Sequence, residues 1–595
     1  MNNDCFSLQM SYEAEEERIQ RMIQEVYDDQ EEVGDDYTAF PSDSDEDFTD
    51  HESGSDHNTE SEEDCDLLEA DGSNNGNQGQ PPPYNFYLGK DKTTKWKKDP
   101  QVPSNVRTRQ HNIITHLPGV KSVAKRAITP VDAFHLFITK DMIHDIVEHT
   151  NDRIEKRSTR YTDKSRVGKT NYAEITALLG LLYLAGSLRS NRQNNRDLWA
   201  DNLLAPDVFK MTMSLFRFQF LLQNLRFDQV TTRNERQSLD KLAPIRTIFE
   251  TFVENCKANY TVSEYVTIDE MLVAFRGRCG FRQFMPKKPA QYGIKIYNLA
   301  GARMFYTLNL EIYAGKQPEG QFKVSNSPQD VVERLIIPLS GSGRNITVDY
   351  WLTSIPLASR IMNHNLTITG TIRKNKREIP PQFVNTKRCT HSSLFGFQED
   401  KTLVSYIPKK GKVVLLLSTM HHDAAIDTST GESQKPEINT LYNLTKGGVD
   451  VVDFLSSKYD VSRNSRRWPL TVVFTLINIC GINSQIIYES NSKDNMVRRK
   501  FLQNLGLELV KPFMEERANV KHLPRGLKEK LRNVYGEPSK KSQPQPKRAK
   551  QGRCSICPRS RDRKSKIECK NCKGIICMEH LIPFCRNCAS ESESD

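Results

Sequence analysis

The chain has 595 residues, more than one ordinary hydrophobic core holds, so its length predicts several domains. Its net charge of +9 is unevenly distributed: residues 1–80 hold 26 acidic and 2 basic side chains, whereas residues 81–595 hold 49 acidic and 82 basic. So basic a region favours a polyanionic partner, either nucleic acid or an anionic membrane surface, and the alternative is a solvated basic surface. The most apolar run, residues 177–186, is shorter than a membrane span and predicts a buried helix, so no membrane segment is expected.

The first 116 residues are predicted to be a disordered acidic tail followed by a basic linker. Residues 43–71 are dominated by Asp, Glu and Ser, and residues 72–83 by Asn, Gly, Gln and Pro. Neither stretch buries enough apolar surface to offset the conformational entropy of the chain. The tail either competes with the polyanionic partner for basic surface, and is then autoinhibitory, or it only keeps the chain soluble.

From residue 132 the hydrophobic pattern predicts helices, and near residue 265 it changes towards the period of strands. The predicted strands are 265–268, 293–297, 305–310, 345–348 and 366–372. The predicted helices that follow the first strands are 329–339, 352–363, 445–459 and 470–488. Strands followed by alternating helices and strands indicate an α/β sheet. A hairpin with strands 403–407 and 413–417 interrupts this pattern and predicts an inserted module.

Three carboxylates are placed where they can converge. Asp269 ends one predicted strand, Asp349 ends another, and Asp450 opens a helix one turn before Asp453. Carboxylates that meet in one place repel each other unless a cation compensates, and Mg²⁺ is the hard ion that prefers oxygen ligands. Two such ions would clamp the attacking and leaving oxygens of a phosphodiester. The alternative interpretation is that Asp349 and Asp450 cap helices and that Asp269 is a solvated strand end.

Basic and aromatic side chains close to these carboxylates are candidates for contacts with nucleic acid. They are Arg276, Arg278, Arg373, Lys376, Arg466, Arg467 and Trp468. Arginine and lysine neutralise phosphates, and an aromatic ring stacks on a displaced base. The alternative is ordinary surface charge, with core packing for Trp468.

Seven of the thirteen cysteines lie between residues 554 and 588, which favours metal binding over disulfides. With one histidine they supply eight ligands in closely spaced pairs: Cys554, Cys557, Cys569, Cys572, Cys577, His580, Cys585 and Cys588. Eight ligands fill two closed tetrahedral Zn²⁺ sites, which predicts a structural module. We expect cross-braced pairing, with Cys554, Cys557, Cys577 and His580 on one ion and the other four on the second, although sequential pairing fits the spacing too. A ubiquitin ligase module of RING type is the competing interpretation.

Four sequence strings resemble the motifs around the catalytic aspartates of piggyBac transposases. They are the stretches 267–270 with 275–279, 345–349, 445–450 and 462–469, in the same order and at similar spacing. The resemblance runs from about residue 130 to 590. It implies an RNase H-like catalytic core with Asp269, Asp349 and Asp450 as metal ligands and Asp453 as a supporting acid. It also implies cut-and-paste transposition through DNA hairpins into TTAA sites.

The resemblance completes the predicted organisation, an α/β plus α chain whose RNase H-like core is a mixed sheet with flanking helices. The predicted parts are the tail and linker 1–116, a helical dimerisation and DNA-binding domain 117–263 and 460–535, the catalytic core 264–373 and 436–459, the insertion 374–435, a linker 536–553, the zinc module 554–588 and an acidic end 589–595. Basic clusters at 540–541 and 547–550 predict a nuclear protein.

Double-stranded DNA, both the element's terminal repeats and the TTAA target, is the partner that the resemblance implies, together with a second copy of the chain in a homodimer. It also implies that the zinc module recognises the ends of the element. The alternative is a domesticated descendant that binds DNA and no longer transposes.

Overall fold

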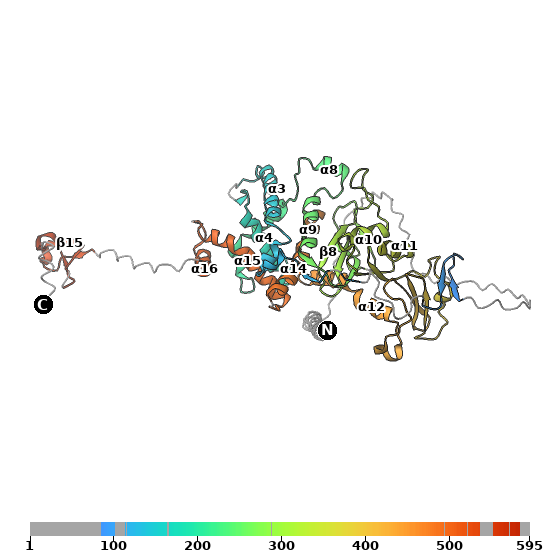
Figure 1. Ribbon diagram of the computed structural model, residues 1–595. Helices are drawn as coiled ribbons and strands as arrows, with labels where there is room; N and C mark the ends of the chain where they lie inside the picture. The colour runs from blue at the N-terminus through green and yellow to red at the C-terminus, as the bar shows by residue number, and fades with distance from the viewer. Residues whose placement is uncertain are drawn as a thin grey trace, which may run out of the picture. The chain divides into compact units, whose positions relative to one another are not determined.

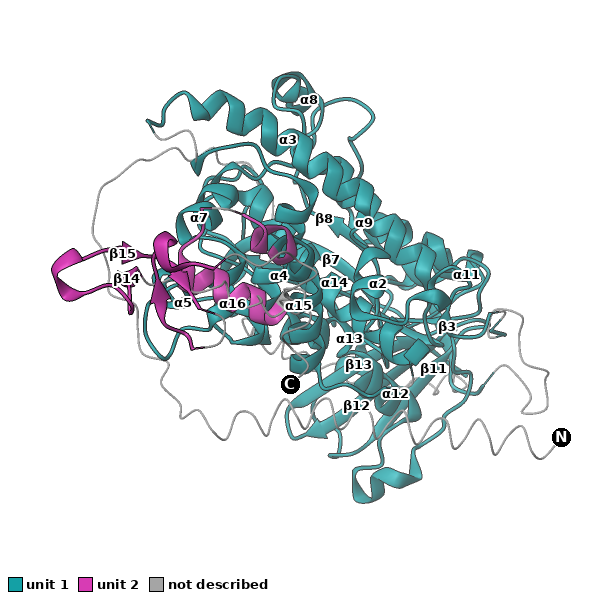
Figure 2. Cartoon of the chain, turned by 90° about the vertical axis from the view of Figure 1, so that its left-hand side faces the viewer, with its two compact units in different colours: residues 1–513 teal, residues 514–595 magenta. Residues whose placement is uncertain are grey.

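The protein is described by a computed structural model over residues 85–100, 113–114, 116–162, 166–286, 288–492, 494–520, 522–535, 551–569 and 572–582. It divides into two compact units, residues 1–513 and 514–595 (Figure 2). The predicted tail before residue 85, most of the linker 536–553 and the acidic end 589–595 lie outside the described residues.

Helices fill the first unit between residues 130 and 259, as the hydrophobic pattern predicts. They are α2 (Pro130–His135), α3 (Lys140–Ser158), α4 (Tyr172–Ser187), α5 (Asn195–Leu198), α6 (Asp207–Thr212), α7 (Leu215–Asn224), α8 (Arg233–Leu239) and α9 (Arg246–Asn259). Side-chain caps set several of their starts: Thr129 and Asp132 form a capping box on α2, and Ser214 caps α7. Each cap satisfies a backbone N–H that the helix itself leaves without an acceptor.

Two further helices, α14 (Trp468–Ser492) and α15 (Arg498–Ala518), return to this helical layer. At Gly180 of α4 an added Cβ would lie only 2.8 Å from the carbonyl oxygen of Gly506 in α15, so small residues permit this close crossing. By its length and composition, helix α14 could cross a membrane. However, the apolar stretch that meets this criterion is 100% buried inside the protein. We therefore describe α14 as a core helix, which the sequence predicts over residues 470–488.

A mixed sheet flanked by helices forms the rest of the first unit and confirms the predicted fold class at that level. Its strands are β1 (Phe86–Leu88), β2 (Lys95–Lys97), β5 (Tyr265–Ala274), β6 (Gln283–Phe284), β7 (Tyr292–Gly301), β8 (Thr307–Ile312), β9 (Asn345–Val348), β10 (Thr367–Thr371), β11 (Ser393–Phe397), β12 (Thr402–Lys409) and β13 (Lys412–Ser418). The order is β1-β2-β11-β12-β13-β10-β9-β5-β7-β6, with β8 also paired to β7. Only the β10-β9 and β9-β5 pairs in this sheet are parallel among the described strands.

Helices α10 (Pro328–Ile336) and α11 (Ile355–Asn363) lie beside the sheet, α10 against β8 and α11 against β10 (Figure 1). Helices α12 (Glu437–Thr445) and α13 (Gly448–Lys458) follow the hairpin, where the sequence predicts a single helix over residues 445–459. The break falls at Lys446 and Gly447. An added Cβ at Gly448 would lie 2.6 Å from Thr267 Oγ1, so the start of α13 approaches β5 too closely for a larger residue.

Part of the segment predicted to be disordered is ordered instead. Strands β1 and β2 pair with each other, and Lys97 pairs with Phe397 of β11. Trp96 has an exposed fraction of 0%, and its indole N–H donates to the carbonyl oxygen of Glu378 at 2.9 Å. Disorder was predicted here because the stretch is rich in positive charge. The structure shows that it is ordered because the ring of Trp96 is buried and because β2 pairs with the distant strand β11.

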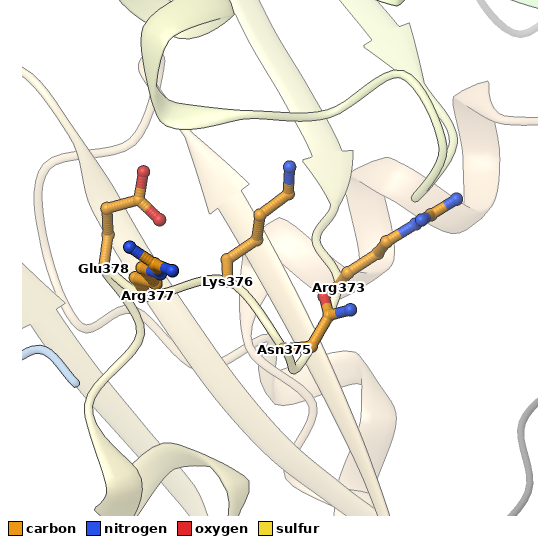
Figure 3. A pocket seen from close by; sticks show the side chains of 5 residues that line it. All are labelled: Arg373, Asn375, Lys376, Arg377 and Glu378. Carbon is orange, nitrogen blue, oxygen red and sulfur yellow. The ribbon is translucent and has the colours of Figure 1, made fainter. Parts of the chain in front are cut away.

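The segment predicted as an insertion contains the expected hairpin, β12 and β13. This hairpin continues the central sheet, because β13 pairs with β10 from Thr369 to Thr371. Arg373 and Lys376 lie in the loop that leaves β10, and Figure 3 shows their side chains extending from this loop to the same side.

The second unit contains α16 (Arg525–Tyr535) and a small module of short strands. Strand β14 (Gly552–Arg553) pairs with β15 (Lys564–Ser565), and β16 (Ile567–Glu568) pairs with β17 (Ile575–Ile576). The buried cluster of the described part of this module consists of Cys554, Cys557 and Cys577, with Ile576 packed against it. Its core is thus made largely of the predicted metal ligands.

Candidate active site and nucleic-acid contacts

Two of the predicted carboxylates meet because their strands are neighbours. Ile268 of β5 pairs with Val348 of β9 in parallel register, and each is followed directly by an aspartate, Asp269 and Asp349. One carboxylate oxygen from each of Asp269, Glu270 and Asp349 lies within 4.8 Å of the others. Glu270 belongs to this group although the sequence analysis did not select it; its adjacency to Asp269 was the available signal.

The prediction that Asp269 ends its strand is wrong. Strand β5 continues to Ala274, because its antiparallel partner β7 carries the pairing on as far as Gly293. Strand β9 does end at Val348, so the side of β5 next to Asp349 is open beyond that residue. Asp269 therefore lies inside its strand, beside the point where the neighbouring strand β9 ends.

Asp349 also stabilises the turn that follows it. Its Oδ1 accepts hydrogen bonds from the backbone N–H groups of Trp351 and Leu352 at 3.1 and 3.0 Å. The N-cap of α11 is Ser354, so the alternative interpretation of Asp349 as that cap is wrong. Asp450 is likewise not a cap, because Gly447 holds that position on α13.

Burial and neighbouring carboxylates destabilise the charged forms of Asp269 and Asp349. Burial, with the neighbouring Glu270 and Asp349, raises the pKa of Asp269 to about 7. Burial and Glu270 raise the pKa of Asp349 to about 6. Oxygen ligands in a site that opposes their ionisation are the donor set that a hard divalent cation compensates. These residues therefore fit a divalent metal.

Asp450 and Asp453 lie near this group but not within it. Asp450 is exposed, and its Oδ1 lies 4.0 Å from the amine of Lys288. Burial raises the pKa of Asp453, while Lys288 lowers it and Asp450 raises it further. Lys288 also donates to the carbonyl oxygen of Glu270 at 2.9 Å. This lysine is a second residue that the sequence analysis missed, because only the fold brings the segment before β7 to the carboxylates.

Three threonines join the carboxylate motifs to one another. Thr267 Oγ1 donates to the carbonyl oxygen of Thr445 at 2.5 Å, and Thr347 Oγ1 donates to Thr445 Oγ1 at 2.7 Å. Thr267 and Thr347 each stand two residues before an aspartate, Asp269 and Asp349. The end of α12 is thereby fixed against β5 and β9, and it sets where α13 begins.

Replacing Thr267 with Val should lower the activity that the family resemblance predicts, DNA strand cleavage, about tenfold, because α13 with Asp450 and Asp453 loses one attachment to β5. The free energy of unfolding should fall by only about 1 kcal/mol, the usual net contribution of one buried hydrogen bond. The matched control is Thr307→Val, which alters an equally buried threonine whose hydroxyl contacts Asn298. Single-turnover cleavage and urea unfolding measure both effects, and an equal loss of rate in the two variants would contradict this role.

Without divalent metal, the free energy of unfolding should fall by roughly 2–4 kcal/mol as the pH rises from about 4 to about 8. The pKa of Asp269 rises from its usual 3.8 to about 7 in the folded protein. The folded state therefore binds this proton more tightly, so the stabilisation is complete below the usual value and is lost as the pH rises through 7. Urea unfolding in EDTA at a series of pH values measures this decline in the free energy of unfolding. In Asp269→Asn the decline should be shallower, and an unchanged slope would contradict the assignment.

The predicted DNA-contact residues fall into two kinds. Arg276, Arg278 and Arg466 are exposed and free to meet a ligand. Arg373 lies over the ring of Trp351, with its guanidinium 4.2 Å from the ring centroid. Together with Lys376 it lines an open cavity of about 340 Å³ (Figure 3).

The other two candidates have structural contacts. Arg467 donates to the backbone carbonyl oxygens of Leu222, Gln223 and Leu225 and so fixes the end of α7. Trp468 is half-buried and packs edge-on against Phe281, with ring centroids 5.0 Å apart. Both interpretations of Trp468, packing and contact with a ligand, are compatible with a ring that is partly exposed.

The zinc module brings together the first and third ligand pairs. Single ligand atoms of Cys554, Cys557, Cys577 and His580 lie within 4.8 Å of one another. Cys557 Sγ is 3.6 Å from Cys577 Sγ, which is 3.3 Å from His580 Nδ1. Ligand atoms around tetrahedral zinc with bonds of 2.0–2.3 Å stand roughly 3.3–3.8 Å apart. The first and third ligand pairs therefore come together, as the cross-braced pairing predicts for one ion. The second set stays a prediction, because Cys585 and Cys588 lie outside the described residues.

Comparisons with known proteins agree with this geometry. The family described as Transposase IS4 matches residues 129–485, more than half of the chain. A solved structure of the piggyBac transposase synaptic complex with hairpin DNA is 38% identical in sequence, with a TM-score of 0.68, and covers 79% of this chain and 100% of that one. The human PiggyBac transposable element-derived protein 3 is 23% identical over 418 residues, 67% of each chain. The human chimeric ERCC6-PGBD3 protein is also 23% identical over 418 residues, but these cover 37% of its length.

The fold and the carboxylate site thus define a transposase. The chain belongs to the piggyBac family.

Proposed function

We propose that this chain is an active, Mg²⁺-dependent DNA transposase that excises a DNA element and inserts it elsewhere. The observation that carries the proposal is the pair of buried carboxylates, Asp269 and Asp349, on adjacent parallel strands. The strand order β8-β7-β5-β9-β10, antiparallel up to β5 and parallel beyond it, supports an RNase H-like core. Residues 264–373 and 436–459 form this core in the proposal.

The carboxylates of Asp269, Glu270 and Asp349 would hold the metal, and Asp450 would join them from α13. Bound divalent cations supply charge neutralisation for the attacking and leaving oxygens of a phosphodiester. The protein's own part is positioning, because phosphoryl transfer requires no covalent nucleophile from the enzyme. Lys288 stands beside Asp450 and offers a positive charge to the DNA backbone.

DNA is the proposed substrate, consistent with the hairpin DNA of the solved relative's complex and with the basic character of residues 81–595. The contacts proposed from unit 1 are Arg276, Arg278, Arg373, Lys376, Arg466, Arg467 and Trp468. The zinc module would bind the ends of the element, and two copies of the chain would act together as a homodimer. Cleavage through hairpins, insertion at TTAA and action in the nucleus complete the proposal.

The test first searches the DNA on both sides of the gene for matching inverted repeats flanked by TTAA, and then uses DNA that carries these ends in a cleavage assay. Purified full-length chain with Mg²⁺ should nick the ends and form hairpins on the element, seen as slowly migrating products on denaturing gels. EDTA should abolish both products. Binding of these ends without any cleavage in Mg²⁺ or Mn²⁺ would overturn the proposal in favour of a domesticated DNA-binding protein.

A further inference from the structure

A cavity of about 220 Å³ lies between the segment after α7 and the residues that open α14. Arg226, Arg233, Arg466 and Arg467 line it, together with Asp228 and Trp468. We call it the arginine cavity. Two more arginines, Arg153 and Arg157 of α3, are close enough to lower the pKa values of Arg226 and Arg467. Three segments far apart in the sequence thus bring their guanidinium groups to one place.

The positive charge of this cavity exceeds the negative charge that the structure places against it. Asp228 pairs with Arg233 and, at 2.7 Å, with Arg236. Within the described residues, the side-chain hydrogen bonds of Arg226 and Arg467 go to backbone carbonyl oxygens. Arg157 donates to the neutral side-chain amide of Asn224. The Nε atoms of Arg153 and Arg157 are buried without a hydrogen-bond acceptor.

Such crowding costs free energy. Burial and then the neighbouring Arg467 and Arg153 lower the pKa of Arg226 to about 9. Burial and Arg233 lower the pKa of Arg467 to about 10. Like charges held together at partly buried positions are stabilised by an anion, and guanidinium groups match the oxygens of a phosphate in charge and geometry.

The arginine cavity is connected to the strand that carries Asp269. An added Cβ at Gly277 would lie 2.7 Å from the carbonyl oxygen of Arg466, so the segment after β5 packs directly against the cavity wall. Trp468 of the cavity packs on Phe281 of the same segment. Gly277 is the eighth residue after Asp269, and an extended chain of that length spans at most about 28 Å. The segment that packs against the cavity therefore lies within about eight nucleotides of the carboxylates along a strand of B-form DNA.

We propose that the arginine cavity binds a backbone phosphate of the DNA being cut, within about eight nucleotides of the reacting phosphodiester. Arg226 and Arg233, which line the cavity, are then phosphate-binding residues in addition to the DNA contacts proposed above, and Arg153 and Arg157 add positive charge beside them. Trp468 is placed to contact the sugar or base next to that phosphate. This inference rests on the proposed function, since it presupposes DNA at the carboxylate site.

The experiment measures binding of a short DNA duplex of arbitrary sequence to the full chain by fluorescence anisotropy, in EDTA and over a range of salt. The double variant Arg153→Gln/Arg226→Gln should bind about tenfold more weakly at low salt, and the slope of log affinity against log salt should become shallower by about 1 to 2. Arg360→Gln is the control, because it removes one charge from α11, outside the cavity. Arg226→Lys should retain most of the affinity.

Thermal unfolding separates a binding role from a structural one. The double variant should melt at the same or a higher temperature, because repulsion between guanidinium groups is relieved. A lower melting temperature with an unchanged salt slope would overturn the proposal. Stabilisation of the wild type by inorganic phosphate, lost in the variant while DNA binding is unchanged, would show a free-anion site and overturn it too. Since no cleavage is measured, absence of nicking by the wild type would affect the proposed function and not this result.

Discussion

Replacing Asp269 with Asn is expected to reduce DNA strand cleavage by at least about a thousandfold and to raise the thermal stability of the chain. The loss of activity follows because the amide offers no negative charge to a divalent cation. The gain in stability follows because Asp269 is crowded by Glu270 and Asp349, and burial with these neighbours raises its pKa to about 7. A residue kept only for structure would lose stability on substitution.

The measurements are single-turnover cleavage in Mg²⁺ and calorimetry in EDTA. The matched control is Asp145→Asn, which makes the same change at an exposed position of α3. Asp349→Asn should resemble Asp269→Asn in both respects. A cleavage rate of Asp269→Asn within about tenfold of the wild type would refute the catalytic assignment.

Asp450→Asn extends the same experiment to the residue that the structure leaves outside the carboxylate group. Asp450 is exposed and faces Lys288, so its substitution should change stability little. If α13 completes the site when DNA and metal are bound, cleavage should still fall by about a thousandfold. A small effect would restrict the metal ligands to Asp269, Glu270 and Asp349.

The second large expected effect is the unfolding of the cysteine-rich module when the zinc predicted for it is removed. A strong chelator, or the substitution Cys577→Ala, should abolish the protection of backbone amides in residues 551–582 against hydrogen exchange. The reason is that the buried cluster of this module is built from Cys554, Cys557 and Cys577 themselves. Binding of zinc to such modules contributes on the order of 10 kcal/mol, far more than the few apolar contacts here.

Hydrogen exchange with mass spectrometry and zinc quantitation measure the change in the full chain. Met578→Ala is the control, because Met578 stands between two ligands and is 75% exposed. Protection in the first unit should persist, and binding to the element's ends should weaken in Cys577→Ala only. Amides of β14 to β17 that remain protected in chelator would show that the module folds without metal.

Much of the candidate site was predictable because its signals are local. Strand 345–348 was predicted with the bounds that β9 has, and Asp349 follows it directly. The cysteine pairs are likewise local, since a gap of two residues lets one turn present both ligands. The four sequence strings predicted membership of the piggyBac family, which the comparisons confirm.

Other features depended on which distant segments pair. Charge suggested disorder for residues 85–100, yet Trp96 is buried where β2 meets β11. Arg467 was selected as a DNA contact, and it also fixes the end of α7 through three carbonyl oxygens. Lys288 was not predicted to belong to the site, because no local sequence pattern relates it to Asp450.

By itself, then, the sequence determined the alternation of helices and strands, two of the carboxylates that meet, Asp269 and Asp349, and the spacing of the predicted metal-binding cysteines. Tertiary structure alone decided that β5 and β9 lie side by side in parallel and that Glu270 joins their aspartates. It also decided that arginines from the segment after α7 and from the start of α14 line one cavity, close to the arginines of α3. The physical reason is that periodicity and turn chemistry act over a few residues, whereas strand pairing and charge clustering depend on contacts between residues far apart in the chain.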